Sequence, residues 1–442
     1  MNEFRGTPNM AAAELPPPPT YYRWSVLVVI SLAMFGNYYV YDAISPIADL
    51  LKSQLGFSDK NIGTLNAIYS IPNVFMVLIG GIIIDRIGVR RATLLFGALC
   101  FCGAVITALT GELAIMATGR LVFGIGAESL IVAVTTALAR WFRGKELSFA
   151  FGINLTIARL GSFLALNSPT WAKPAFVNWQ WPLLITVALA TFCVVGPVIY
   201  GIMENRAGKK FSMKQAGGTD KVEFSQIFRM SPSYWLVVLM CVTFYAGIFP
   251  FQTFAIKFFQ EAHGTTREYA GFLSSVLTLF AMIFTPIFGI LVDRVAKRSL
   301  FMMFGSLLLV PVYLMMAYTP IPLIVPMAMM GIAFSLVPAI MWPSVAYIVD
   351  QNRLGTAYGL MTMIQNIGLA GFNLLIGWAN DHTGANMTNP GGYALGMWLF
   401  SVTGFLGFFF AWLLRRAETG PKAHGLETIT VKSSAKAMNA GN

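Results

Sequence analysis

The 442 residues are 56% hydrophobic and only 11% charged, and they carry a formal net charge of +11. Soluble domains contain about 25% charged residues, so this composition excludes an ordinary soluble enzyme. Apolar runs of about 20 residues recur along the chain, and each is long enough to cross a hydrocarbon core about 30 Å thick. The sequence therefore predicts an all-α polytopic membrane protein embedded in a lipid bilayer.

Twelve transmembrane helices are expected along the chain. The segment before them contains four consecutive prolines, Pro16 to Pro19, and lacks the apolar core of a signal peptide, which predicts a cytosolic tail. The predicted spans are approximately 22–50, 61–84, 91–110, 113–139, 146–169, 181–203, 232–258, 269–292, 299–318, 321–348, 354–379 and 392–414.

Most lysine and arginine residues occupy the loops that follow even-numbered spans. The opposite loops hold only Lys52, Lys60, Lys173 and Arg267. Because basic loops remain in the cytoplasm, both termini are predicted to be cytoplasmic. This topology also accounts for the positive net charge, and no nucleic-acid partner is expected.

The longest internal polar stretch divides the chain into two halves. We predict a disordered cytosolic tail at 1–20, a six-helix bundle at 21–203, a cytosolic linker at 204–230, a second six-helix bundle at 231–416 and a disordered cytosolic tail at 417–442. The halves share glycines and a basic loop at matching offsets. Such internal duplication is typical of transporters built from repeats.

The loop after the second span reads Gly81-Ile-Ile-Ile-Asp85-Arg86-Ile-Gly88-Val-Arg90-Arg91, and the loop after the eighth reads Gly289-Ile-Leu-Val-Asp293-Arg294-Val-Ala-Lys297-Arg298. This repeated motif resembles the hallmark motif of the major facilitator superfamily. That resemblance implies two pseudo-symmetric six-helix bundles. Glycine, aspartate and arginine at this spacing are expected to form a conformational latch, with charge-assisted bonds between the halves in one state. Topology-setting charge alone would explain the arginines but not the glycine or aspartate. The latch residues are Gly81, Asp85, Arg86, Arg90, Arg91, Asp293 and Arg294.

Two charged residues lie inside apolar runs: Glu128 in Leu121–Leu138 and Arg159 in Leu147–Leu166. A charge at the centre of a membrane helix costs about 2.5–3.5 kcal/mol on insertion scales, so it needs a partner, water or a ligand. A rise of about 1.5 Å per residue places both near the bilayer midplane. The pair predicts a binding site, with a structural ion pair between neighbouring spans as the alternative.

Further candidate binding residues accompany this pair. Asp42 and Tyr39 lie in the first span before the kink expected at Pro46, which suggests a cavity-lining helix. Lys257 lies at the end of the seventh span. The alternatives are a carboxylate near the headgroups for Asp42 and snorkelling for Lys257.

Aromatic and amide side chains in the second half complete the candidate set. Tyr245 and Trp342 are expected to supply cavity walls, although core or lipid-facing rings are common in a chain so rich in aromatic residues. The repeat places Asn366 at the position that corresponds to Arg159, and Ser335 at the position of Glu128. The intramembrane charges therefore belong to the first half alone.

Longer stretches, among them Gly119-Arg-Leu-Val-Phe-Gly-Ile-Gly-Ala-Glu-Ser-Leu and Ala158-Arg-Leu-Gly-Ser, resemble the superfamily branch that includes lysosomal dipeptide transporters of animals. The resemblance implies passive dipeptide transport by alternating access, with Glu128 and Arg159 contacting the peptide termini. A zwitterion needs an anion for its ammonium and a planar donor for its carboxylate, which this pair supplies. Ala127 and Ala137 depart from that branch, which leaves side-chain preference open.

Several alternatives remain. Uniport is the leading mode, and proton-coupled symport through Asp42 and Glu128 is its alternative, because all three histidines lie in loops or a tail. An organic-anion or sugar-acid carrier would use Arg159 and Lys257, and a nutrient sensor would bind without transport. No enzymatic, metal or cofactor constellation appears, so none is expected.

The expected partner is a small-molecule substrate, and the expected assembly is a monomer. Neither tail shows an acidic dileucine sorting signal. We therefore expect a cell inner membrane location, with the lysosomal membrane as the alternative.

Overall fold

A computed structural model describes residues 18–142, 147–211, 230–350 and 354–428. These ranges are almost entirely helical, and they form no β-strand. Most of the predicted N-terminal tail, most of the predicted linker and the last fourteen residues of the predicted C-terminal tail lie outside them.

The first bundle is formed by the helices before the central linker. Its elements are α1 (Thr20–Asp42), the 3-10 helix η1 (Ser45–Ile47), α2 (Ala48–Leu55), α3 (Asp59–Ile87), α4 (Val89–Leu109), α5 (Leu113–Phe142), α6 (Leu147–Leu166), α7 (Ser168–Trp171), the 3-10 helix η2 (Lys173–Val177), α8 (Gln180–Ala190) and α9 (Phe192–Lys210). Helix α9 continues into the segment predicted as linker.

The second bundle follows the linker and repeats the pattern of long helices. Its elements are α10 (Pro232–His263), α11 (Arg267–Val295), α12 (Arg298–Tyr318), α13 (Ile324–Ile348), α14 (Leu354–His382), the 3-10 helix η5 (Pro390–Tyr393) and α15 (Ala394–Glu418).

Ten segments in the described residues are long and apolar enough to cross a membrane, one of them formed by α8 and α9 together. Helix α3, with 29 residues, and helix α6, with 20, complete a set of twelve. Neither is among the ten, and α6 contributes a shorter apolar segment, Ala150–Leu166. Both pack against other helices of the first bundle. The predicted twelve-helix fold in two bundles is confirmed.

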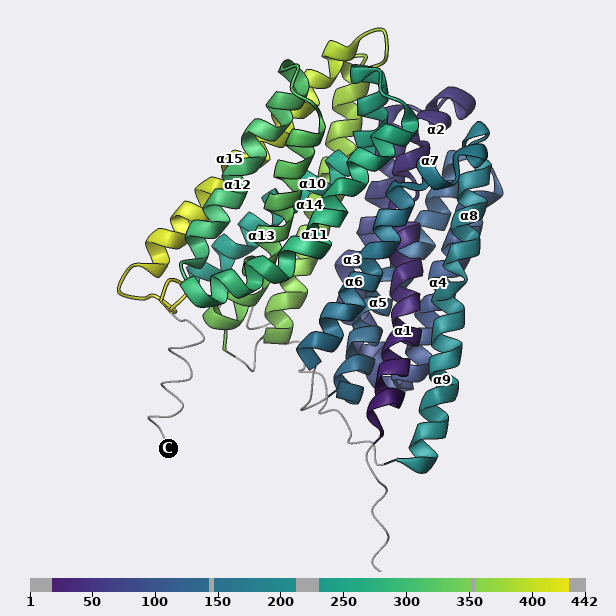
Figure 1. Ribbon diagram of the computed structural model, residues 1–442, viewed down its shortest axis with the longest axis vertical. Coiled ribbons are helices and arrows are strands. Elements are labelled where there is room, and N and C mark those ends of the chain that lie inside the picture. Colours follow the sequence, from purple (N-terminus) through teal and green to yellow (C-terminus); the bar gives the residue numbers. More distant parts are fainter. Residues whose placement is uncertain (1–17, 143–146, 212–229, 351–353, 429–442) are drawn as a thin grey trace, which may run out of the picture.

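The two bundles lie side by side and lean against each other at one end (Figure 1). Helix α1 begins and α15 ends at the opposite end, which we call the terminal end; the end where the bundles meet is the distal end. The principal contacts between bundles pair α3 with α14 and α6 with α11. Two glycines permit the α3–α14 approach, because a Cβ on Gly63 would lie 2.4 Å from the Asn373 carbonyl oxygen and one on Gly377 would lie 2.6 Å from the Asp59 carbonyl oxygen.

The predicted disorder of 417–428 is wrong, because this segment folds back onto the second bundle. Glu418 ends α15 fully buried and accepts a hydrogen bond from the Ser233 hydroxyl at 2.7 Å. The Glu427 carboxylate accepts a hydrogen bond from the backbone N–H of Ser299, at 2.9 Å, in the first turn of α12. A carboxylate at a helix N-terminus is stabilised by the helix dipole and the unpaired N–H groups there, which the segment's polar composition does not reveal.

Packing within the first bundle yields a stability prediction. A Cβ on Gly97 of α4 would lie 1.9 Å from the backbone carbonyl oxygen of Cys193 on α9. Because backbone cannot yield like a flexible side chain, Gly97→Ala should destabilise the protein by about 1–3 kcal/mol. Thermal unfolding in detergent measures this, with Gly371→Ala as the control because nothing lies within 4 Å of its Cβ position. Equal melting temperatures for the two variants would contradict the close packing of α4 on α9.

Candidate functional site

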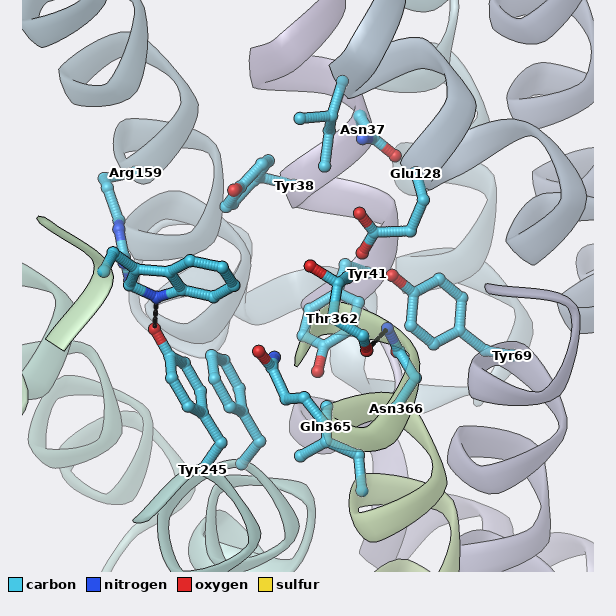
Figure 2. A pocket seen from close by; sticks show the side chains of 14 residues that line it. Asn37, Tyr38, Tyr41, Tyr69, Glu128, Arg159, Tyr245, Thr362, Gln365 and Asn366 are labelled. Carbon is cyan, nitrogen blue, oxygen red and sulfur yellow. Dashed lines mark hydrogen bonds between the residues drawn. The ribbon is translucent and has the colours of Figure 1, made fainter. Parts of the chain in front are cut away.

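A cavity of about 280 Å³ lies between the two bundles (Figure 2). Its walls come from α1, α3, α5 and α6 of the first bundle and from α10, α13 and α14 of the second. The lining residues are Asn37, Tyr38, Tyr41, Tyr69, Glu128, Ile131, Arg159, Tyr245, Phe249, Trp342, Thr362, Gln365, Asn366 and Leu369.

Five of the eight predicted binding residues line this one cavity: Glu128, Arg159, Tyr245, Trp342 and Asn366. They come from both halves of the chain, and Glu128 and Asn366 are more than 200 positions apart. The structure therefore brings both intramembrane charges together with the aromatic and amide groups of the second half.

Glu128 and Arg159 lie on opposite sides of the cavity (Figure 2). Among the described residues, no ion pair within 4.0 Å involves either side chain. The alternative, a structural pair that holds α5 to α6, has no contact to support it in this conformation. Both charges face the space between them.

Tyrosines surround the carboxylate side of the cavity. The Tyr69 hydroxyl points toward the Glu128 carboxylate (Figure 2), and the rings of Tyr41 and Tyr69 meet edge to face with centroids 5.0 Å apart. The buried Arg120 guanidinium lies 5.4 Å from the Tyr69 ring centroid and donates to the Tyr41 carbonyl oxygen at 3.2 Å. Arg120 thus joins α1, α3 and α5 behind the tyrosines and does not line the cavity.

The second bundle presents an aromatic and amide face. The Trp342 indole N–H donates to the Tyr245 hydroxyl oxygen at 2.9 Å, so the Tyr245 hydroxyl proton remains available to a ligand (Figure 2). The Asn366 side-chain amide donates to the Thr362 carbonyl oxygen at 3.0 Å, which orients the Asn366 oxygen. This face offers neutral hydrogen-bonding groups and ring surface in place of charge.

A wider hollow of about 780 Å³ adjoins the cavity and shares Trp342 with it. Its other walls lie on α6 of the first bundle, in the part of α13 nearest the terminal end and at the start of α14. They are Phe151, Pro343, Ala346, Tyr347 and Tyr358. The cavity therefore continues toward the terminal end, where the bundles diverge (Figure 1).

Tyr39 and Asp42 are not among the residues that line the central cavity. Tyr39 is buried within the first bundle, where it packs beside Phe35 and Gly161. Asp42 lines an adjoining hollow of about 10 Å³, which shares Tyr41 and Phe249 with the cavity. The helical period explains the first result, because Tyr38 and Tyr41 share one face of α1, while Tyr39 points elsewhere.

Lys257 also lies away from the cavity and forms a buried ion pair between the bundles. Its Nζ lies 2.7 Å from Oδ2 of Asp59 on α3, and both side chains are 0% exposed. It also lies 3.2 Å from Glu261, one turn along α10, and donates to the Tyr393 hydroxyl oxygen at 2.7 Å. Burial of the ammonium among these partners favours the ion pair over snorkelling in this conformation.

A second contact reinforces the distal end. The Asp381 carboxylate of α14 accepts hydrogen bonds from the backbone N–H groups of Asp59, at 2.8 Å, and Lys60, at 2.7 Å. These groups belong to the first turn of α3, so a residue of one bundle caps a helix of the other. The Lys52 ammonium lies 3.6 Å from the Asp59 carboxylate and completes the cluster. The distal end is thus closed by buried polar contacts.

The predicted latch residues lie at the terminal end of α3, α4 and α11. The Arg90 guanidinium donates to the Asn205 side-chain oxygen within the same bundle. The side chains of Asp85 and Asp293 lie outside the described part of the structure. Exposed side chains occur at Arg86, Arg91 and Arg294, and Gly81 has open space at its Cβ position. A bond between the bundles through this motif stays a prediction.

Sequence reasoning missed several lining residues, mainly on α1 and α14. Asn37, Tyr38 and Tyr41 follow the helical spacing of one face and could have been found by that period. Gln365 precedes Asn366 and carries the same functional group. Tyr69 carried no distinguishing pattern, since the proline-containing α3 reads as an ordinary apolar span.

Comparisons with known proteins agree with this architecture. The family model described as Major Facilitator Superfamily matches residues 30–256 and 248–437. The lysosomal dipeptide transporter MFSD1 of Danio rerio is 33% identical over 383 residues, covering 82% of each chain, and that of Homo sapiens is 31% identical over 376 residues, covering 82% of this chain and 81% of the relative.

A solved structure shares the fold at low sequence identity. It is the crystal structure of a bacterial homolog to the human lysosomal transporter Spinster, in an inward-facing and unoccupied conformation. It has a TM-score of 0.72 and 17% identity, and covers 90% of this chain and 98% of its own. With the family model matching most of its length and its twelve helices in two bundles, the chain belongs to the Major Facilitator Superfamily of membrane transporters.

Proposed function

We propose that this transporter carries dipeptides as a uniporter, binding both peptide termini in the central cavity near the middle of the membrane. The observation that carries the proposal is the position of Glu128 and Arg159 on opposite walls of one cavity, with no ion pair between them. A carboxylate suits the peptide ammonium, and a guanidinium suits the peptide carboxylate. The relatives named as dipeptide transporters support the same substrate class.

The size of the site also supports a small zwitterion. The termini of a dipeptide lie at most about 7 Å apart by backbone reach. The cavity, about 280 Å³, is slightly smaller than the usual range of small-molecule pockets, about 300–1,000 Å³. Larger peptides therefore fit poorly unless they extend into the wider hollow beside Trp342.

Alternating access follows from the two ends of the molecule. The distal end is closed by the Lys257–Asp59 pair and the Asp381 cap, while the cavity continues toward the terminal end. We place the termini in the cytoplasm on the strength of the basic loops. This conformation is then inward-open, and transport requires the distal contacts to open in turn.

The experiment that tests the substrate is thermal unfolding of the purified protein with a panel of ligands. A ligand that binds only the native state stabilises it by mass action, by about 2.7 kcal/mol of unfolding free energy at a concentration of one hundred times Kd. The melting temperature rises accordingly. Dipeptides should stabilise the protein, whereas N-acetylated or C-amidated dipeptides, free amino acids and sugar acids should not. Stabilisation by sugar acids alone would contradict the proposal.

Flux distinguishes uniport from symport and from sensing. Proteoliposomes preloaded with unlabelled dipeptide should take up labelled dipeptide by counterflow. Net uptake should change the pH of a lightly buffered lumen no more than in liposomes without protein. Proton movement matched to dipeptide uptake would instead identify symport, for which Asp42 and Glu128 are the candidate carriers. Binding without counterflow would identify a sensor.

An organic-anion carrier is the second candidate, but the structure gives it less support. That function needs two cations at one anion, and Lys257 is held in the distal ion pair away from Arg159. Glu128 would also face the anion without a positive partner. Retained transport of an amine-free acid by Glu128→Gln would be the result in its favour.

We propose that the protein resides in a cell inner membrane and is a monomer. The alternative location is the lysosomal membrane, which the names of the relatives favour. Fluorescence of a fused reporter in the native cell distinguishes the compartments. Light scattering of the detergent-purified protein tests the oligomeric state.

A further inference from the structure

Arg159 has an aromatic partner that belongs to the opposite bundle. Its guanidinium carbon lies 4.7 Å from the ring centroid of Phe334. Arg159 belongs to α6 of the first bundle and Phe334 to α13 of the second. In the described part of the chain, no carboxylate forms an ion pair with this guanidinium.

The plane of the Phe334 ring is fixed by its neighbours. Its side chain is buried and meets Phe249 edge to face, with centroids 5.7 Å apart at 87°, and Tyr245 likewise at 6.4 Å and 84°. The rings of Tyr245 and Phe249 stack in parallel, 5.5 Å apart at 3°. Since three rings hold one another, Phe334 presents its face to Arg159 without freedom to turn.

We propose that Phe334 is a positioning residue that keeps Arg159 ready for the substrate carboxylate. This inference rests on the proposed function. The negative face of the ring attracts the cation, but a ring face takes up none of the five guanidinium N–H donors. The ring contact therefore leaves the donors available for a bidentate bond to the incoming carboxylate.

The ring also explains why the two cavity charges stay apart. Glu128 and Arg159 lie on consecutive helices of one bundle, and a long arginine side chain can swing toward a nearby anion. The attraction to Phe334 draws the guanidinium to the wall of the second bundle, away from Glu128. Without the ring, Arg159 is free to pair with Glu128, and a dipeptide would first have to break that pair.

A graded substitution tests this attraction while preserving the shape of the ring. Phe334 is replaced by 4-fluoro-, 3,5-difluoro- and 3,4,5-trifluorophenylalanine, because each added fluorine weakens the negative face. We expect the dipeptide KM in counterflow to rise stepwise, by about fivefold to tenfold across the series. The maximal rate should stay within twofold. Phe334→Leu should raise KM at least as much as the trifluoro variant.

The matched control is the same series at Phe251, which is buried on α10 against Tyr313 and Phe400, outside the cavity lining. Its KM should not change. A flat series at Phe334, with Arg159→Ala still abolishing transport, would overturn the role of the ring and leave the proposed function standing. Unchanged transport in Arg159→Ala would instead overturn the proposed function.

Discussion

Arg159→Ala is expected to abolish dipeptide transport while the protein still folds. The substrate carboxylate would enter the cavity without a cation, and leaving one member of a buried charge pair unpaired costs about 3–5 kcal/mol. Affinity should therefore fall by two to three orders of magnitude. Folding should survive, because no described ion pair depends on this arginine and its ring contact lies on a cavity wall.

Two conservative variants sharpen this result. Arg159→Lys keeps the charge but loses the planar fork, so binding should weaken by about tenfold and remain measurable. Glu128→Gln should weaken the binding of free dipeptides strongly. It should change the binding of N-acetylated dipeptides little, since these have no ammonium for the carboxylate to bind. Counterflow in proteoliposomes and the ligand-induced melting shift measure both effects. Uptake that persists in Arg159→Ala would remove this residue from the site.

Asp59→Asn is expected to shift the transporter toward a conformation open at the distal end. In the closed conformation, the Asp59 carboxylate holds Lys257 of the other bundle at 2.7 Å. On separation, Lys257 keeps Glu261 on its own helix at 3.2 Å, and Asp59 keeps Lys52 of its own bundle at 3.6 Å. Each charge therefore still has a partner of opposite sign after the bundles separate, which limits the free energy needed for opening.

This exchange of partners predicts opposite effects for the two carboxylates that contact Lys257. Asp59→Asn removes the partner used only in the closed conformation, so opening becomes easier. Glu261→Gln removes a partner that Lys257 retains after opening, so the closed conformation becomes favoured. We expect at least a tenfold change in the opening equilibrium in each direction.

A cysteine introduced at Ile62 reports on opening, because this residue is fully buried at the distal end. The background is Cys102→Ser, which removes the exposed native thiol. The rate of maleimide labelling in detergent should rise in Asp59→Asn and fall in Glu261→Gln. A change of the labelling rate in the same direction in both variants would contradict the proposed exchange of partners.

The sequence could predict the depth of the cavity residues but not the direction in which every side chain points. Glu128 and Arg159 stand out because a charge inside an apolar run is costly unless it faces a partner, water or a ligand. Asn366 is found because the internal repeat aligns it with Arg159. Tyr39 and Tyr38 are not distinguished in the same way. A helix packed on several sides has no clean apolar stripe, so its cavity face is defined only by the neighbours.

Lys257 shows a different limit. Its partner Asp59 is 198 positions away in the chain and belongs to the other bundle. No periodicity links two residues whose contact depends on how the bundles are tilted. Its position at the end of a span gives no sign of this partner, because the packing of α3 against α10 and α14 determines that Lys257 is buried in an ion pair.

Within the described lining of the central cavity, Glu128 and Arg159 are the two charged residues, one of each sign. A neutral dipeptide adds one ammonium and one carboxylate, so the loaded and the empty carrier have the same formal charge. The membrane potential, worth about 2.3 kcal/mol per elementary charge per 100 mV, then does no work on such a cargo. A dipeptide with one lysine side chain carries a net positive charge, and uniport would accumulate it about fifty-fold on the negative side at 100 mV. Voltage would thus sort substrates by their side chains, through a site that itself contributes no net charge.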